Sequence, residues 1–245
     1  MKTVILNLGC GTKTHSDVVN IDWSIYLKIK QSPLLSFMAR PFIKGKRRER
    51  FDAIPDNIIV HDLSQGLPFG EGEADVVYHS HLLEHLETKN AEVFLRNIFI
   101  VLKPGGVMRV VVPDFEFLCR TYVEFLDRCN ANPDSADNSD PYIADIIEQM
   151  VRLEAYGSSR QNILQRFIEN KILGDARKRG ETHQWMYDKI NLKRLLTDVG
   201  FRNIKVKKYN DSSIAGWNDL GLDLNESGTE YKPGSLYVEC EKGVE

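Results

Sequence analysis

The chain has 245 residues, which is more than one compact domain usually needs and less than two. With 42% hydrophobic residues and 17 glycines, the composition is ordinary for a folded globular protein and excludes a disordered or collagen-like chain. No run of about 18 apolar residues occurs, and the N-terminus lacks the charged-then-apolar layout of a signal peptide, so we expect a cytoplasmic protein. The four cysteines stand far apart without a C-x-x-C pair, which indicates free thiols rather than disulfides or a zinc knuckle.

The net charge of −3 conceals an asymmetry along the chain. Residues 28–50 hold eight Lys or Arg against Glu49 alone, whereas residues 211–245 carry eight acids and two lysines. A basic segment of this kind can attract an anionic partner, or it can simply be solvated. Because the chain is acidic overall and no further basic stripe with interleaved aromatic residues occurs, we do not expect nucleic-acid binding.

Short apolar runs predict five strands in the first half of the chain, at residues 3–8, 18–22, 58–61, 74–78 and 107–112. Each run is apolar throughout, which is typical of a parallel sheet covered on both faces. Apolar side chains at helical spacing over residues 91–102, followed by Lys103-Pro104-Gly105-Gly106, predict a helix that ends in a tight turn.

Helices dominate the prediction for the second half. Asp114 is placed to cap a helix after the fifth strand, and Asp188 to cap another that Gly200 ends. We expect a loop at 130–141, further helices within 142–153 and 161–173, and closing strands at 201–209 and 235–240. The alternation predicts one α/β domain over residues 1–245, a doubly wound, mostly parallel seven-stranded sheet with helical cap insertions at about 24–56 and 115–187.

A glycine-rich turn and an acid follow the first two predicted strands. Gly9 and Gly11 permit a sharp turn and a close approach of the backbone to a ligand, and Asp22 can accept hydrogen bonds from both hydroxyls of a ribose. This combination predicts a nucleoside-type cofactor. Thr14 stands where the dinucleotide fingerprint needs its third glycine, so we do not expect a pyrophosphate cradle.

Polar groups also follow the third and fourth predicted strands, namely Asp62 and the segment His79–His81. In an open α/β sheet the ligand lies outside the carboxyl ends of the strands. The sequence therefore predicts one crevice that four strand ends share.

These motifs resemble those of the class I S-adenosylmethionine-dependent methyltransferases. The resemblance rests on LNLGCG at 6–11, VNID at 19–22, HDLSQGLPF at 61–69, ADVVYHSHLLEHL at 74–86 and VLKPGGVMRVVVPD at 101–114. Together they span the first 114 residues in the order of the family. The later THQWMYD at 182–188 also resembles a group of small bacterial methyltransferases associated with cell-surface glycan synthesis.

The resemblance implies a Rossmann-like methyltransferase fold with S-adenosyl-L-methionine as the cofactor. By the same resemblance Gly9 and Gly11 approach the methionine part of the cofactor, Asp22 holds its ribose, and Asp62 with Leu63 contacts its adenine. The cofactor-binding set that we expect is completed by Asn7, Cys10 and His79.

The chain departs from the family pattern in two places. Asn7 stands where the family often has an acid, so it brings no charge to the ammonium group of the cofactor. Only the nine residues from Gly9 to Asp17 separate the first two strands, whereas a parallel crossover normally takes a dozen or more. We therefore expect the first helix to be vestigial.

Methyl transfer from a sulfonium is an in-line displacement, so the protein mainly holds the acceptor atom about 3–3.5 Å from the methyl carbon and supplies a base if the acceptor is a hydroxyl. We consider His81, His183 and Asp114 as candidate catalytic residues. His183 lies in a polar-aromatic loop with Trp185 and Tyr187 that could close over a sugar-sized acceptor. Each candidate also has a structural interpretation, as a helix-start hydrogen bonder, a hydrogen-bonded loop residue and an N-cap respectively.

Residues 81–85 (HLLEH) match H-x-x-E-H, the zinc motif of inverzincin peptidases, with both imidazoles on one helical face. However, Leu82, Leu83 and Leu86 indicate a helix that packs in the core, and a preceding strand is the wrong context for a helical zinc peptidase site. We therefore expect no metal, and His85 as a buried, hydrogen-bonded side chain.

The insertion between the second and third strands mixes apolar residues with the eight cations. It could touch an anionic membrane surface, through residues 24–50, or a phosphate-bearing acceptor such as a lipid-linked glycan. The alternative that we favour is a helical cap that covers the acceptor pocket and exposes its cations.

The sequence thus predicts methyl transfer from S-adenosylmethionine to a hydroxyl of a sugar or small molecule. Two alternatives stay open: a non-catalytic scaffold that binds S-adenosylmethionine, suggested by Asn7 and the short crossover, and a zinc hydrolase built on the H-x-x-E-H motif. The acceptor and the oligomeric state are not encoded in any motif that we identify.

Overall fold

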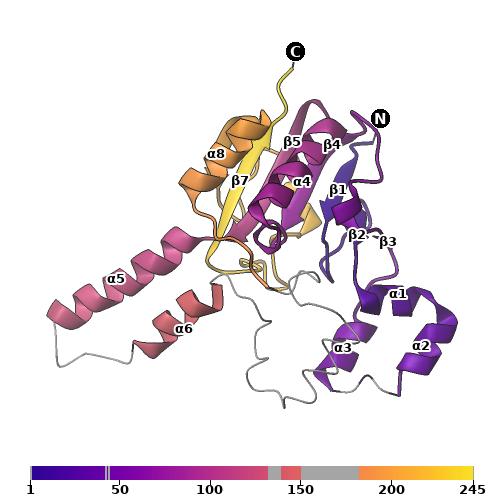
Figure 1. Ribbon diagram of the computed structural model, residues 1–245, viewed down its shortest axis with the longest axis horizontal. Coiled ribbons are helices and arrows are strands. Elements are labelled where there is room, and N and C mark those ends of the chain that lie inside the picture. Colours follow the sequence, from indigo (N-terminus) through magenta and orange to yellow (C-terminus); the bar gives the residue numbers. More distant parts are fainter. Residues whose placement is uncertain (1, 42, 44, 132–138, 150–181, 245) are drawn as a thin grey trace.

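The computed structural model describes residues 2–41, 43, 45–131, 139–149 and 182–244. Its centre is a seven-stranded sheet in the order β3-β2-β1-β4-β5-β7-β6 (Figure 1). The first five strands run parallel, and β7 is antiparallel to β5 and to β6. The predicted mostly parallel, seven-stranded α/β sheet is confirmed. The strands are β1 (Ile5–Leu8), β2 (Val19–Asp22), β3 (Ile58–Val60), β4 (Ala74–Ser80), β5 (Leu102–Pro113), β6 (Arg202–Lys207) and β7 (Ser235–Glu241).

Two helices, α4 (Thr88–Val101) and α8 (Lys189–Val199), cover one face of the sheet side by side (Figure 1). Their buried side chains, Leu95 and Ile98 from α4 and Leu192 and Leu196 from α8, join the strands in the larger core. The predicted cap of α8 is confirmed, because the Asp188 carboxylate accepts hydrogen bonds from the first turn in a capping box. Its predicted end is confirmed as well, with Gly200 in the left-handed conformation.

The opposite face is covered by a segment with little regular structure, residues 209–222, which includes one 3₁₀ turn at Trp217–Leu220. Trp217 packs edge-on against Tyr78 of β4, with the ring centroids 5.0 Å apart, and Leu222 lies in the same core. A buried Arg109 on β5 forms ion pairs with Asp223 and Glu239 on this face. A covering segment of this type has no helical periodicity, and for that reason the sequence pattern does not predict it.

The first crossover contains no helix between β1 and β2, as the short spacing predicts. The backbone amides of Gly9 and Cys10 donate instead to the carbonyl of Ile21 on the neighbouring strand. The buried Asn7 side chain donates to the carbonyl of Lys13 and to the Asn20 side chain, at 2.9 and 3.1 Å. Asn7 therefore holds the turn together from beneath.

The cap insertion at 24–56 is helical, with α1 (Ile25–Gln31), α2 (Pro33–Ala39) and α3 (Lys46–Asp52). Leu27 of α1 packs against Cys10 and Ile58, which attaches the insertion to the ends of β1 and β3. Figure 1 shows the three helices beside the ends of these strands.

The second insertion begins with α5 (Phe115–Ala131) and α6 (Asp140–Gln149), which pack together through stacked Phe125 and Tyr142 rings. Both helices intrude into the stretch 130–141 that the turn formers predict as a loop. The helix predicted at 161–173 lies outside the described residues. No helix in the part of the chain that the structure describes is long and apolar enough to cross a membrane.

The turn predicted at residues 103–106 belongs to β5 in the structure. The amide of Gly105 donates to the carbonyl of Lys242, and the amide of Lys242 donates to the carbonyl of Gly106. β5 extends through these glycines because they pair with the chain that follows β7. No local sequence pattern predicts this pairing.

Candidate functional site

The carboxyl ends of the five parallel strands meet at one edge of the sheet, where the strand order reverses between β1 and β4. Such a switch point is the usual place for a ligand in an open α/β sheet. The predicted site residues that follow the strands all lie at this edge: the Gly9–Gly11 turn after β1, Asp22 at the end of β2, Asp62 after β3, His81 after β4 and Asp114 after β5. The first residue of the antiparallel β7, Ser235, pairs with Pro113 and reaches the same edge.

The turn after β1 has the backbone shape that its glycines permit. Gly9 and Gly11 have φ values of +66° and +55°, and a Cβ on Gly9 would stand 3.1 Å from the side chain of Leu82. The carboxylate of Asp22 accepts hydrogen bonds from the amides of Gly11 and Trp23, both at 2.5 Å. A carboxylate offers about four lone-pair positions, so acceptor capacity remains for the two hydroxyls of a ribose.

Asp62 and Leu63 form a second corner of this edge. One carboxylate oxygen of Asp62 accepts from the amide and the hydroxyl of Ser64, at 3.0 and 2.7 Å, and so caps the short turn Leu63–Gln65. Leu63 packs against the larger core. Both residues thus lie at the carboxyl edge of the sheet, where Asp62 has a capping role, and the adenine contact stays a prediction.

The side chains of Asn7, Cys10 and His79 are closed off from solvent. Burial, with a smaller contribution from the charge of Asp22, raises the pKa of the Cys10 thiol to about 12, so it remains protonated. Burial lowers the pKa of His79 to about 4, so its ring is neutral at pH 7. Because these side chains are covered, a contribution to cofactor binding has to come from their backbone.

The segment His81–His85 differs from the predicted helix. His81 has a φ of +50°, and only the single 3₁₀ turn Leu83–His85 follows β4. Nε2 of His81 lies 2.9 Å from the hydroxyl of Ser235, whereas Nδ1 of His85 lies 3.2 Å from the carbonyl of Thr182. The two imidazoles therefore do not share a helical face. The physical reason is the sharp reversal past the switch point, which brings Leu82 over Gly9.

Glu84, the acid of the H-x-x-E-H match, is a functional candidate that the predicted set of site residues does not contain. Its side chain is only 1% exposed, with Oε1 3.3 Å from Nδ1 of His81 and 4.0 Å from Nε2 of His85. Neither carboxylate oxygen has a hydrogen-bond partner among the described residues. Burial raises the pKa of Glu84, but the facing His81 and His85 outweigh burial and hold the pKa below its usual value. An acid within a run of leucines that pack in or against the core, namely Leu82, Leu83 and Leu86, is the sequence signal that could have identified it.

The loop at 182–187 is hydrogen-bonded to the backbone of Glu84. The backbone carbonyl of Glu84 accepts hydrogen bonds from the amides of Gln184 and Trp185, at 2.6 and 3.2 Å. His183 lies between these contacts and Thr182, and its ring meets that of His85 edge-on, with centroids 4.8 Å apart. The structure thus brings His183 to Glu84, almost a hundred residues away in the chain.

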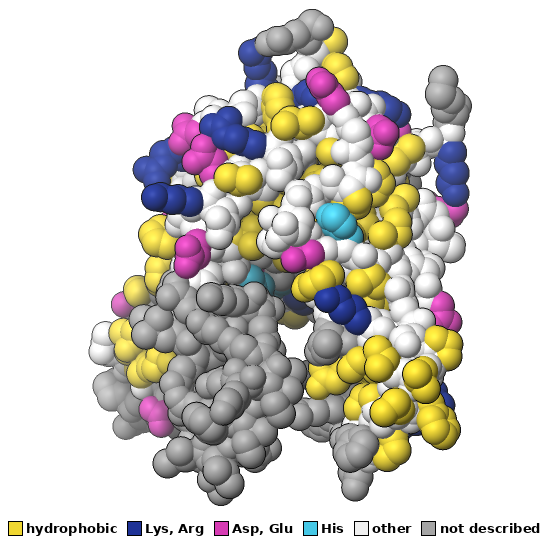
Figure 2. Space-filling model, turned by 45° about the vertical axis from the view of Figure 1, so that its right-hand side comes forward, with side chains coloured by type: hydrophobic (Ala, Val, Ile, Leu, Met, Phe, Trp, Pro, Cys, Tyr) yellow, Lys and Arg dark blue, Asp and Glu magenta, His cyan; other side chains and the backbone are white. Residues whose placement is uncertain are grey.

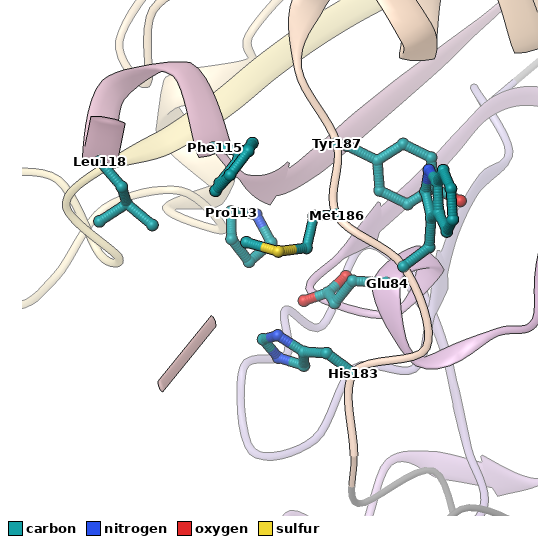
Figure 3. Close-up of a pocket in the computed structure, with 8 residues that line it drawn as sticks. Glu84, Pro113, Phe115, Leu118, His183, Met186 and Tyr187 are labelled. Carbon is teal, nitrogen blue, oxygen red and sulfur yellow. The ribbon is translucent and has the colours of Figure 1, made fainter. Parts of the chain in front are cut away.

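A small pocket of about 10 Å³ opens beside Glu84 and His183. Figure 3 shows the Glu84 carboxylate and the His183 ring next to one another, with Met186 and Pro113 close by. The complete lining is Glu84, Pro113, Phe115, Leu118, His183, Trp185, Met186 and Tyr187. This volume is room for about one water-sized group.

Asp114 acts as the predicted helix cap. Its carboxylate accepts from the amide of Phe117 at 3.3 Å, and burial raises its pKa. The amide of Phe115 donates to the carbonyl of Tyr187, which joins the start of α5 to the loop that carries His183. Of the three predicted catalytic residues, only His183 lines the pocket.

Known proteins resemble this chain in its first half above all. Residues 6–110 match the protein family described as a methyltransferase domain. An uncharacterized methyltransferase of Synechocystis sp. is 30% identical over 107 residues, which are 44% of this chain and 45% of the relative. The match thus spans less than half the length of that curated relative.

Two solved structures of S-adenosylmethionine-dependent methyltransferases are also similar. The protein from Methanosarcina mazei has a TM-score of 0.48 and 17% identity, covering 100% of this chain and 95% of its own. The protein from Archaeoglobus fulgidus has a TM-score of 0.43 and 14% identity, with 98% and 86% covered. Both scores lie below 0.5, so the fold is described from the strand order of the sheet.

Proposed function

We propose that this chain, whose residues 6–110 match the family described as a methyltransferase domain, uses S-adenosylmethionine to methylate a hydroxyl group of a small molecule or a glycan. The observation that carries the proposal is the carboxyl edge of the sheet. The turn of Gly9 and Gly11 lies with Asp22 on one side of the switch point, and the pocket of Glu84 and His183 lies on the other.

The residues at this edge fit the cofactor. The glycine turn leaves open space at Gly11, where no atom would approach a Cβ within 4 Å. The half-buried Asp22 has lone pairs to spare for ribose hydroxyls, which is the role that its position predicts. When bound, S-adenosylmethionine supplies an electrophilic methyl group on a sulfonium.

The remaining chemistry falls to the pocket. A hydroxyl acceptor has to lose its proton, either to a base or because a neighbouring electrophile lowers its pKa. His183 and Glu84 face the pocket, whereas the Asp114 carboxylate caps α5 and His81 lies between Ser235 and Glu84. We therefore expect the acceptor to lose its proton on the side of the pocket where His183 and Glu84 lie.

The test is a calorimetric titration of the full chain with S-adenosylmethionine, followed by an assay of S-adenosylhomocysteine formation on a panel of sugars and small alcohols. We expect saturable binding by the wild type, and in Asp22→Ala a loss of about 1–3 kcal/mol of binding free energy through a lost charge-assisted hydrogen bond. A folded Asp22→Ala variant with unchanged affinity would count against the assigned pocket. Binding without turnover on every acceptor would favour the non-catalytic scaffold.

A lipid-linked acceptor is supported by the insertion. Leu34, Leu35, Phe37 and Met38 of α2 are all exposed, and Phe37 is 78% exposed. Figure 2 shows hydrophobic side chains gathered at the lower right of the molecule, where the insertion lies. We propose that this helix touches a membrane surface.

Some of the cations in the same insertion form contacts within the insertion itself. Lys30 donates to the carbonyls of Asp52 and Ile54, and Arg48 pairs with Asp52 at 2.6 Å. These contacts favour the helical cap interpretation for the charged residues, so the apolar face of α2 is the part to test. We expect sedimentation with vesicles that contain anionic phospholipid, and its loss in Phe37→Glu. Equal sedimentation of both proteins would reject the membrane contact.

A further inference from the structure

Three side chains, two of which line the pocket, converge on one point. Glu84, His85 and His183 each offer one ligand atom, and these atoms all lie within 4.8 Å of one another. Two imidazoles and a carboxylate are the donor set of catalytic zinc sites, which keep a fourth position for water or substrate. With bonds of about 2.0–2.1 Å, two ligands on a tetrahedral ion stand roughly 3.3 Å apart, so the set needs to close by roughly 1.5 Å.

The buried carboxylate of Glu84 is an independent indication of a missing partner. It is 1% exposed, and neither of its oxygens accepts a hydrogen bond within the described part of the chain. A charge in such a place is normally paired, fully hydrogen-bonded or bound to a metal. His81 contacts the carboxylate at 3.3 Å and Lys232 lies nearby. Neither of them donates a hydrogen bond to its oxygens.

The imidazole of His85 is oriented as that of a metal ligand usually is. When Nδ1 of His85 donates to the carbonyl of Thr182, its Nε2 carries the lone pair, and that atom lies 4.0 Å from Oε1 of Glu84. The carbonyl of Glu84 holds the amides next to His183, so the loop presents this ring to the same point. This set differs from the His81 and His85 pair of the H-x-x-E-H motif, because His183 takes the place of His81.

We propose that Glu84, His85 and His183 bind one divalent metal ion of the Zn²⁺ type, with the adjoining pocket as its open coordination position. The pocket of about 10 Å³, lined by Glu84 and His183, has room for one water or one acceptor oxygen. His81 lies on the other side of Glu84, with Nδ1 3.3 Å from Oε1 of Glu84 and Nε2 2.9 Å from the hydroxyl of Ser235.

The role of the ion rests on the proposed function. A hydroxyl of the acceptor bound at the open position has its pKa lowered and releases its proton to water. The oxygen then forms a bond to the methyl carbon while the carbon–sulfur bond breaks, and the sulfur keeps the electron pair as S-adenosylhomocysteine. His183 is then a ligand rather than the base itself.

The experiment uses the full chain, stripped with a chelator and titrated with Zn²⁺ alone by calorimetry. We expect one ion per chain in the wild type and in His15→Ala, a matched histidine variant remote from the site. In Glu84→Gln and in His183→Ala we expect affinity at least about 10-fold weaker. Thermal melting without metal checks that each variant is folded.

Equal Zn²⁺ affinity in all four proteins, or no stoichiometric binding by the wild type, would overturn the site. Loss of methyl transfer in His183→Ala with zinc binding intact would also overturn it, because His183 would then act as a base. Titration with S-adenosylmethionine in chelator is run separately. Its failure would remove the proposed function, while the zinc titration would still decide the metal site.

Discussion

Two clusters of buried charge lie in this molecule, and they differ in how completely they are paired. On the face covered by residues 209–222, the Arg109 guanidinium donates to Asp223 at 2.8 Å and to Glu239 at 2.7 Å. Asp223 also accepts from the hydroxyl of Tyr78 and the indole of Trp217, both at 2.7 Å. At the carboxyl edge, by contrast, Glu84 has no hydrogen bond to either oxygen within the described residues.

The contrast separates a structural cluster from a functional one. Arg109 also donates to two backbone carbonyls, so the network holds a segment without regular structure against the sheet. Complete hydrogen bonding of this kind stabilises one arrangement of the side chains. It leaves few free donors or acceptors for a ligand. We expect the incompletely hydrogen-bonded cluster at Glu84 to contribute less to stability, because functional sites often leave such groups for a ligand.

The largest expected loss of stability follows from removing one partner of the Arg109 cluster. Asp223→Ala leaves Arg109, Tyr78 and Trp217 without their acceptor, so we expect the free energy of unfolding to fall by about 3–5 kcal/mol. Urea denaturation followed by circular dichroism measures this loss. A loss below about 1 kcal/mol would mean that the network is dispensable.

The Arg109 cluster should also make the stability of the protein depend on pH in the acid range. Burial raises the pKa of Glu239, but hydrogen bonds from Ser212, Ser213 and Arg109 outweigh burial and hold the pKa below its usual value. Because the folded pKa lies below the unfolded one, Glu239 contributes stability above the unfolded pKa of about 4.3, and this contribution is lost as the pH falls through the folded value.

We therefore expect Glu239→Gln to be less stable than the wild type by about 1.5–3 kcal/mol near pH 6. The difference should shrink as the pH falls to about 3, since the wild-type carboxylate then takes up its proton. Denaturation midpoints at several pH values give the comparison. A difference that stays constant over this range would contradict the assignment of acid sensitivity to Glu239.

Neutralising Glu84, whose oxygens accept no hydrogen bond among the described residues, should have a much smaller effect on stability. Glu84→Gln weakens the contacts with His81 and His85 but breaks no hydrogen bond to the carboxylate within the described residues, so we expect a loss of no more than about 1 kcal/mol in metal-free protein. A loss as large as that of Asp223→Ala would show that Glu84 belongs to the structural framework. The same urea titration serves both variants.

The smallest change is expected at His79, whose two ring nitrogens have no hydrogen-bond partner in the described structure. The neutral ring packs edge-on against Phe94, with centroids 5.4 Å apart. His79→Leu replaces buried polar atoms by apolar ones of similar volume, so stability should stay the same or rise by up to about 1 kcal/mol. A clear loss in thermal melting would indicate a partner for His79.

The sequence by itself determined the elements whose signals are local. The apolar runs predicted the seven strands to within a few residues, except β5, which begins earlier, and the Asp188 cap with Gly200 delimited α8. Gly9 and Gly11 announced the positive φ values of the first turn. These features depend on neighbouring residues, and neighbouring residues are what a sequence pattern displays.

Only the tertiary structure decided which distant groups meet. His183 reaches Glu84 because the amides of the two residues that follow it donate to the carbonyl of Glu84, and Arg109 meets Asp223 across 114 positions of sequence. The same packing overrides the helical signal of residues 81–85, since the chain has to reverse over Gly9. Contacts of this kind depend on the path of the whole chain, so no local periodicity can specify them.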